Sequence, residues 1–197
     1  MNVILGHAEL AMEQEGQSVE SGMEVILETG SDLLKTVEKE RQIVEVLIDS
    51  NELAVFDIAD VLSGLLDSFR SDVPEVTIET EFASDSTVVA IPEIRDAIAE
   101  LLENAVEHAT QSPEIVVQTE SVDDTVRIRI RDNADPIPGN EFQPLFISED
   151  PSDLYHGTGL GLWLVHWIVD ISDGGLEFGR TSCDDGNVIT IRLPRAE

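Results

Sequence analysis

The sequence has almost no cysteine and no long apolar run. Its single cysteine, Cys183, excludes an intramolecular disulfide and a cysteine-based zinc site. No apolar stretch approaches the ~20 residues that a membrane-spanning helix needs, and the first residues lack the basic segment and cleavage site of a signal peptide. We therefore expect a cytoplasmic chain, although a full-length protein could be attached to a membrane through further N-terminal regions.

Basic residues are the other scarce class. The chain carries 11 lysines and arginines against 41 aspartates and glutamates, and the net charge of −30 is spread along its whole length. Such a chain repels nucleic acid and anionic membranes, so neither is expected as a partner. It also repels itself, and salt at ~1 M would screen this repulsion because the Debye length falls to ~3 Å. The charge indicates adaptation to a salt-rich, halophilic cytoplasm, with an ordinary acidic protein as the alternative.

The first 50 residues follow a helical pattern. Apolar residues predict one helix over residues 2–14 and a longer one over about residues 19–48, joined by a short polar link. Two such helices form an antiparallel hairpin. The second helix is more than twice as long as the first, so its far half lacks a partner within the chain. We expect a second copy of the chain, in a homodimer, or a missing N-terminal segment to supply that partner.

Residues 51–197 mix helices with strands and are expected to form a separate domain. Asp57 can cap a helix that runs to about Arg70, a second helix follows Pro92, and a nearly all-apolar helix spans about Leu160–Ile171. Alternating apolar residues predict strands at 53–56, 76–82, 87–90, 115–119, 125–131, 176–180 and 188–193. The expected fold class is α+β, a two-layer sandwich whose mixed, mostly antiparallel sheet is covered by about three helices.

A row of polar residues lies along the helix that follows Pro92. The apolar residues of this helix, which runs to about Ala109, recur at i, i+3, i+4 and i+7 and define one buried face. Glu100, Asn104 and His108 stand at the margin of that face, four residues apart, and side chains at this spacing are neighbours on a helix. A solvated helix flank would give the same pattern. Two later segments favour a functional row.

The first of these segments is the end of the strand VRIRIR. This strand leads directly into Asp132, whose carboxylate is well placed to accept a hydrogen bond from an exocyclic amine. Arg127, Arg129 and Arg131 alternate with apolar residues and are expected to face outward. They could form an anion site, but with so many carboxylates in the chain surface ion pairs are the favoured interpretation.

The second segment is Gly157–Leu162, which reads GTGLGL and opens the apolar helix. Glycines let backbone N–H groups approach a phosphate, and a helix N-terminus favours an anion. The segment does not follow the strand of a βαβ unit, so a Rossmann site matches poorly, and GxxxxGK[ST] is absent. The preceding residues 139–156 form a long loop, which favours a functional lid. We expect Gly174-Gly175 to end the helix, and His166 within it to be a hydrogen-bonded core histidine.

Together these residues resemble the ATP-binding domain shared by gyrase, heat-shock chaperones, sensor histidine kinases and MutL, the GHKL class. Glu100-x-x-x-Asn104 is similar to its N-box, Asp132 begins a G1-box, and Gly157–Leu162 matches the G2-box. Phe146 falls where an F-box aromatic is expected. The GG pair at 174–175, the IRLP ending at 191–194 and the first residues, 2–7, resemble sensor histidine kinases in particular.

The resemblance implies a role for each position. Asn104 would coordinate a Mg²⁺ ion that bridges the ATP phosphates, Glu100 would be the catalytic residue that assists proton handling, and His108 would contact phosphate. Asp132 would bind the adenine amine, with residues 139–156 as the ATP lid. The other implied ATP-binding positions are Ala134, Ile137, Phe146, Gly157, Thr158, Gly159, Leu160, Gly161 and Leu162.

The implied activity is ATP-dependent phosphorylation of a histidine, followed by transfer to the receiver domain of a response regulator. The acceptor histidine would lie about two helical turns before Asn2, and His7 is not at that position. The G1 pattern DxGxG also has both glycines replaced, by Ala134 and Pro136. This leaves open a catalytically lapsed nucleotide-binding or dimerisation module. A kinase or ATPase of the same fold acting on another target is the third reading.

Overall fold

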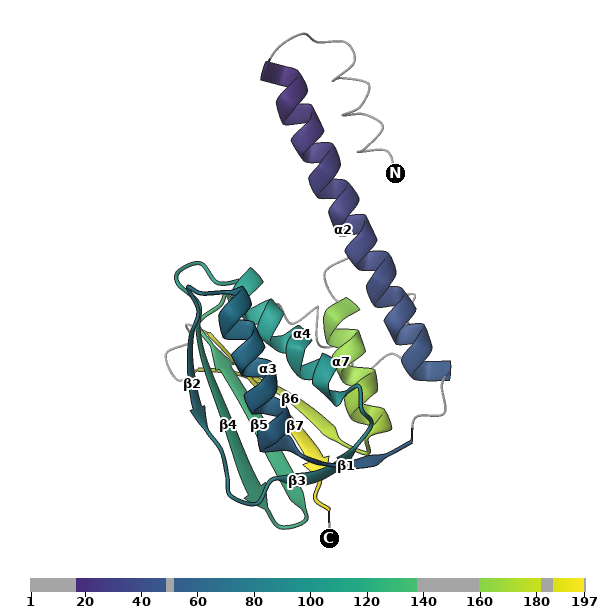
Figure 1. Cartoon of the computed structure of the whole chain (residues 1–197), viewed down its shortest axis with the longest axis vertical. Helices are drawn as coiled ribbons and strands as arrows, with labels where there is room; N and C mark the ends of the chain where they lie inside the picture. The colour runs from purple at the N-terminus through teal and green to yellow at the C-terminus, as the bar shows by residue number, and fades with distance from the viewer. Residues whose placement is uncertain (1–16, 49–51, 138–159, 182–185, 197) are drawn as a thin grey trace. The chain divides into compact units, whose positions relative to one another are not determined.

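The computed structural model describes residues 17–48, 52–137, 160–181 and 186–196 (Figure 1). Helix α2 (Gln17–Ile48) agrees with the longer of the two predicted N-terminal helices. The shorter one, over residues 2–14, lies outside the described residues, as does the predicted lid at residues 139–156. The chain divides into two compact units after Gln42, and all the described strands belong to the second unit.

Five strands form the main sheet, in the order β2-β4-β5-β7-β6. They are β2 (Thr77–Glu81), β4 (Glu114–Val122), β5 (Thr125–Asp132), β6 (Gly175–Arg180) and β7 (Asn187–Pro194). Strands β2 and β4 pair in parallel, and the other neighbouring pairs are antiparallel. Strands β1 (Ala54–Asp57) and β3 (Thr87–Ala90) form a separate antiparallel pair. This mixed, mostly antiparallel sheet confirms the predicted fold class.

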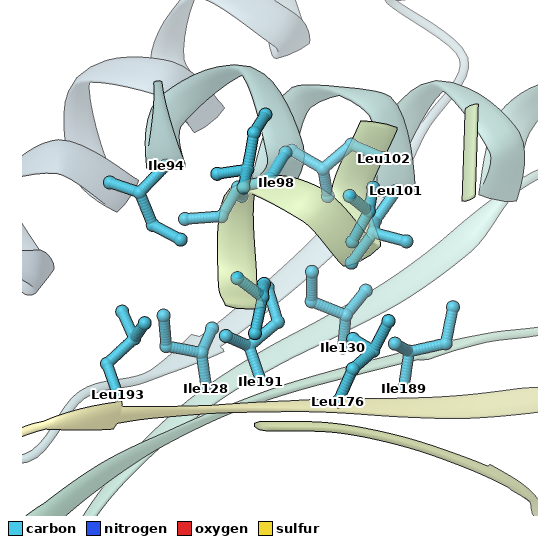
Figure 2. Close-up of a cluster of buried hydrophobic side chains, with 14 of the residues drawn as sticks. Ile94, Ile98, Leu101, Leu102, Ile128, Ile130, Leu176, Ile189, Ile191 and Leu193 are labelled. Atoms are coloured by element: carbon cyan, nitrogen blue, oxygen red, sulfur yellow. The ribbon is translucent and has the colours of Figure 1, made fainter. Parts of the chain in front are cut away.

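Three helices cover one face of the main sheet (Figure 1). They are α3 (Ile58–Asp72), α4 (Ile94–Glu107) and α7 (Leu160–Ile171). Figure 2 shows Ile94, Ile98 and Leu101 of α4 pointing at isoleucines and leucines of β5, β6 and β7. Burying each such side chain contributes roughly 1.5–3 kcal/mol. The predicted apolar face of α4 is therefore the face that builds the core.

The register of the central strands explains the alternation in VRIRIR. Ile128 lies opposite Ile191 and Ile130 lies opposite Ile189, and all four side chains are buried. The arginines between them lie on the other face, as predicted, where Arg129 is 4.0 Å from the carboxylate of Glu120. The side chain of Arg127 differs from an ordinary surface cation, because its Nε is buried and has no hydrogen-bond partner among the described residues.

The ends of the helices follow from local hydrogen bonds. Asp57 caps α3 as predicted, because its Oδ1 accepts from the backbone N–H of Ala59 at 3.0 Å and from the Ser86 hydroxyl at 2.9 Å. A cap of this kind stabilises a helix by about 1 kcal/mol. Ser86 is buried, and its hydrogen bond to Asp57 also joins the start of α3 to the segment before β3.

The end of α7 corrects one prediction. The left-handed residue after this helix is Asp173, with φ 52°, rather than a glycine. Gly174 N–H donates to the Val169 carbonyl at 2.9 Å and Asp173 N–H donates to Asp170 at 3.0 Å, the two bonds of a Schellman motif. Gly174 is needed for another reason: a Cβ there would lie 2.6 Å from the carbonyl oxygen of Arg192.

His166 also departs from its prediction as a hydrogen-bonded core residue. Its side chain is half-buried, and no hydrogen bond links it to another described residue. Its ring instead packs edge-on to Trp163, with centroids 6.2 Å apart, and lies 5.5 Å from the ring of Trp167. Burial lowers the pKa of His166, and the nearby Asp170 carboxylate partly offsets this.

Within the described ranges, no helix combines the length and apolar character needed to cross a membrane.

Candidate functional site

A cavity of about 340 Å³ opens beside the C-terminal half of α4. Its walls come from α4, from the loop after β5, from the first turn of α7 and from the start of β7. The lining residues are Leu101, Asn104, Ala105, His108, Asp132, Ala134, Asp135, Pro136, Ile137, Leu162, Asn187 and Ile189. This volume lies within the range of small-molecule sites, and apolar walls with a few polar groups are typical of them.

Helix α4 brings two members of the predicted polar row into the cavity. Asn104 and His108 line it together with Leu101 and Ala105, because residues three and four apart share a helix face. The third member, Glu100, does not line the cavity; its buried carboxylate lies against Gly161 in the first turn of α7. The row is therefore divided between the cavity and the packing of α4 against α7.

Asp132 is the buried carboxylate of the cavity. It is the last residue of β5, and its residue surface is only 7% exposed. Its Oδ1 accepts three hydrogen bonds: from Ala134 N–H at 3.0 Å, from Asn187 N–H at 3.1 Å and from the Asn187 side-chain amide at 2.9 Å. No donor among the described residues is bonded to Oδ2. Asp132 therefore keeps one carboxylate oxygen for a ligand.

The electrostatics of Asp132 follow from this burial. Burial raises the pKa of Asp132 above its usual value. The hydrogen bonds from Asn187 and Ala134 and the nearby charge of His108 lower the pKa by less. Ionised Asp132 is thus less well solvated than a carboxylate in water, and a ligand donor that reaches Oδ2 would stabilise its charged form.

The loop after β5 is held against the end of α4. Ala134 and Ala109 form an antiparallel β-bridge, and Asp135 N–H donates to the His108 carbonyl at 3.1 Å. Ala109 takes part in this bridge, and α4 ends at Glu107, two residues before the predicted end. Among the described non-glycine residues, only Asp123 and Asp173 have positive φ, so Ala134 needs no glycine backbone.

Asn187 is the residue that the sequence analysis missed. It is only 4% exposed, and its side chain contacts both Asp132 and the loop that follows β5. A signal was present, because Asn187 shares the inward alternation of Ile189, Ile191 and Leu193 and is the one polar residue among them. Its partners lie fifty or more residues earlier in the chain, which no local pattern could show.

The structure places only part of the predicted glycine segment. Leu160 and Gly161 form the first turn of α7, and Leu162 lines the cavity. Gly157, Thr158, Gly159 and Phe146 lie outside the described residues. Among the residues that are described, no group of three or more histidine, cysteine, aspartate or glutamate side chains could hold a metal ion.

Comparison with known proteins decides the family. The family model described as histidine kinase-, DNA gyrase B- and HSP90-like ATPase matches residues 90–197. The chain belongs to this family. The match begins at the end of β3 and extends over α4, the loop after β5, α7 and β7, so it includes every element that lines the cavity.

Curated relatives of this ATPase family member are sensor proteins. The chain is 27% identical over 165 residues to the alginate biosynthesis sensor protein KinB of Pseudomonas aeruginosa and 29% identical over 157 residues to the sensor histidine kinase CusS of Escherichia coli. These alignments cover 73% and 74% of this chain but only 27% and 32% of the relatives. The chain thus spans about a third of their length or less.

A solved structure supports the same fold. The histidine kinase ThkA, in complex with the response regulator protein TrrA, matches with a TM-score of 0.74 at 18% identity. The match covers 99% of this chain and 58% of that one. At this identity the likeness shows the fold, which agrees with the mixed sheet and the helical layer described above.

Proposed function

We propose that this chain is the ATP-binding core of a protein histidine kinase of two-component signalling. The observation that carries the proposal is Asp132, a buried carboxylate with one uncommitted oxygen, in the cavity of a domain from this ATPase family. The core would transfer the γ-phosphoryl of ATP to a histidine outside residues 1–197, and from there to the receiver domain of a response regulator.

The chemistry of the cavity fits an adenine base. The apolar side chains of Leu101, Ile137 and Ile189 suit the faces of a purine ring. Oδ2 of Asp132 would accept a hydrogen bond from its exocyclic amine. The backbone of Ala134 completes the wall beside that carboxylate. A purine that lacks the amine would leave a buried carboxylate oxygen unpaired, which is costly.

The residues also fit a magnesium ion that arrives with the nucleotide. Mg²⁺ is usually bound through one or two protein groups together with substrate phosphates, rather than by a full protein cage. Asn104 offers one such oxygen in the cavity, and the described residues contain no competing cage. Mg²⁺ would neutralise phosphate charge, and Asn104 would coordinate the ion. His108 would contact phosphate, and Glu100 would assist proton handling.

The predicted glycine segment would complete the phosphate site. Leu160 and Gly161 stand at the N-terminus of α7, where backbone N–H groups favour an anion. We propose that Gly157, Thr158 and Gly159 bring further backbone N–H groups to the phosphates. Phe146 would contact the nucleotide from the lid at residues 139–156.

The N-terminal region would be a dimerisation element. We propose residues 1–50 as a helical hairpin and residues 51–197 as the catalytic domain. Large apolar side chains of α2 are exposed, including Leu27 at 70% and Leu34 at 72%. A second copy of the chain would cover them. The net charge of −30 supports work in a salt-rich cytoplasm and opposes binding to nucleic acid.

One observation favours a second candidate function. The G1-box has Ala134 and Pro136 in place of its two glycines. If the lid cannot close over such a loop, the chain would bind nucleotide without phosphoryl transfer. Radiolabelled ATP, offered to the chain together with a supplied helix that carries an acceptor histidine, separates the two. Phosphohistidine supports the kinase, and ATP binding without label supports the lapsed module.

Isothermal titration calorimetry with ATP, with and without Mg²⁺, tests the nucleotide site. We expect binding by the wild type, and we expect Asn104→Ala to abolish the part that depends on Mg²⁺. Gln118→Ala is the matched control, because Gln118 is an amide on β4 that bonds to Glu81 and does not line the cavity. No ATP binding by the wild type at up to ~1 mM ATP, or Mg²⁺-dependent binding unchanged in Asn104→Ala, would reject this assignment.

A further inference from the structure

We infer that Asn187 is the positioning residue that makes Asp132 selective for an amino-purine, in place of the flexible glycines that the G1-box lacks. The inference rests on the proposed function, because it concerns how the same cavity recognises its base. Asn187 acts through Asp132 and through the loop at residues 133–137, and both polar atoms of its side chain are already committed to them.

Asn187 determines which of the two oxygens of Asp132 is left for a ligand. Asn187 supplies two of the three hydrogen bonds to Oδ1, from its backbone N–H at 3.1 Å and from Nδ2 at 2.9 Å. The third comes from Ala134 N–H at 3.0 Å. A carboxylate oxygen with three donors has little capacity for another. The carboxylate is thereby fixed in one orientation, with Oδ2 as the acceptor left for a ligand.

Asn187 also holds the backbone around Pro136. Nδ2 of Asn187 also donates to the Asp135 carbonyl at 3.1 Å, and Oδ1 of Asn187 accepts from Ile137 N–H at 2.9 Å. These two bonds hold the chain immediately before and after Pro136, a residue that has no N–H of its own. One buried amide therefore fixes both the acceptor and the loop that forms its wall.

Only an amide can make this set of bonds. The set needs two N–H donors, for Asp132 and Asp135, and one acceptor, for Ile137, and the asparagine side chain offers these groups. The reversed orientation would set the amide oxygen against a carboxylate and a carbonyl, so one orientation alone satisfies the partners. Aspartate has no donor when ionised, and alanine has neither group. Gly186 before it is equally constrained, since a Cβ there would overlap the Asp132 carbonyl oxygen.

The test compares two nucleotides on the full chain. ATP and purine riboside triphosphate differ by the exocyclic amine, which the second replaces with hydrogen. For the wild type we expect ATP to bind ~10–100-fold more tightly, the usual effect of a hydrogen bond to a charged group. For Asn187→Ala we expect ATP affinity to fall while the affinity for the amine-free nucleotide changes little, so that the preference drops to about threefold or less.

The control variant is Asn133→Ala. Asn133 is an asparagine of the same loop, and its side chain forms hydrogen bonds of 3.0 Å to the backbone of Glu114 and of Ser112 but none to Asp132. The Asn133→Ala variant should be less stable than the wild type yet keep its preference for ATP. An equal loss of affinity for both nucleotides in Asn187→Ala, or an unchanged preference for ATP, would overturn the inference. A wild type that binds neither nucleotide would reject the proposed function instead.

A nearly isosteric variant covers the case in which Asn187→Ala does not fold. Asn187→Asp sets a second carboxylate against Oδ1 of Asp132, and two such groups share one proton more readily than both ionise. We expect its preference for ATP to be lost near pH 8 and to recover as pH falls toward 6, whereas that of the wild type stays constant. A preference in Asn187→Asp that equals the wild type at every pH would also overturn the inference.

Discussion

The carboxylate of Glu100 fills the space in which Gly161 would carry a side chain. Glu100 lies on α4 and is only 6% exposed, and Gly161 lies in the first turn of α7, where it is buried. The N-terminus of a helix carries partial positive charge, so it favours a nearby carboxylate. The absence of a Cβ at Gly161 thus allows α4 to present an acid to α7 at close range.

Substitution of Gly161 tests this contact. Gly161→Ala would place a methyl group on the Glu100 side chain, and displacing a buried side chain costs roughly 1–3 kcal/mol of unfolding free energy. Gly64→Ala is the matched control, because Gly64 is also helical and a Cβ there meets nothing within 4 Å. That change should stabilise by about 0.5–1 kcal/mol. Urea denaturation of both variants measures the difference, and a Gly161→Ala protein as stable as Gly64→Ala would contradict the contact.

Asp132→Asn should stabilise the protein at neutral pH. A raised pKa means that the folded state binds this proton more tightly than the unfolded state. The resulting stability is present below the ordinary aspartate pKa and is lost as pH rises through the folded-state pKa, so ionised Asp132 is a cost at pH 7. Asparagine keeps an oxygen for the three donors and removes the charge.

We therefore expect Asp132→Asn to melt at a higher temperature than the wild type at pH 7, with the gap closing as pH falls toward 4. Asp135→Asn removes one charge from an exposed side chain of the same loop and is the control for net charge. A difference in melting temperature that widens on acidification would contradict the raised pKa of Asp132. Asp132→Asn should also lose ATP affinity, because the charge that destabilises the fold is the charge that accepts the hydrogen bond from the ligand.

His166 should make the fold sensitive to mild acid. Burial lowers the pKa of His166, so its stability contribution is complete above the ordinary histidine pKa and is lost as pH falls below it. His166→Gln should lose less stability than the wild type between pH 7.5 and 5.5. Asp170→Asn should lose more, because the Asp170 carboxylate favours the charged imidazole. Fluorescence of Trp163 and Trp167 reports unfolding, and parallel curves for all three proteins would reject the role of His166.

Salt should raise thermal stability. Two effects oppose each other: KCl weakens exposed ion pairs such as Arg192–Glu177, at 3.0 Å, and it screens the repulsion of a −30 chain. Exposed pairs contribute only about 0–1 kcal/mol each, so screening should dominate. We expect the melting temperature to rise from ~0.1 M KCl and to level off in the molar range, where the Debye length is ~3 Å. A melting temperature that does not change up to ~2 M KCl would contradict this.

Local patterns predicted the fold because the elements repeat them many times. Val126, Ile128 and Ile130 alternate with arginines over a whole strand, and the alternation matches the observed register. The site was predicted in part for the same reason, since Asn104 and His108 share a helix face. What a local pattern cannot express is a pairing across the chain. The contact of Asp132 with Asn187 and the bridge of Ala109 with Ala134 both join residues that are far apart in the sequence.

The position of β7 in the sheet has a consequence for folding. This strand comes last in sequence, yet it lies between β5 and β6 in the five-stranded sheet and carries Asn187 at its first position. The β4–β5 hairpin closes over a turn at Asp123 and can form early, because its contacts are local. Insertion of β7 closes a loop of more than fifty residues and is slow by comparison. The cavity should therefore be among the last parts of the domain to form, and nucleotide should have no affinity for a chain in which β7 has not yet paired with β5.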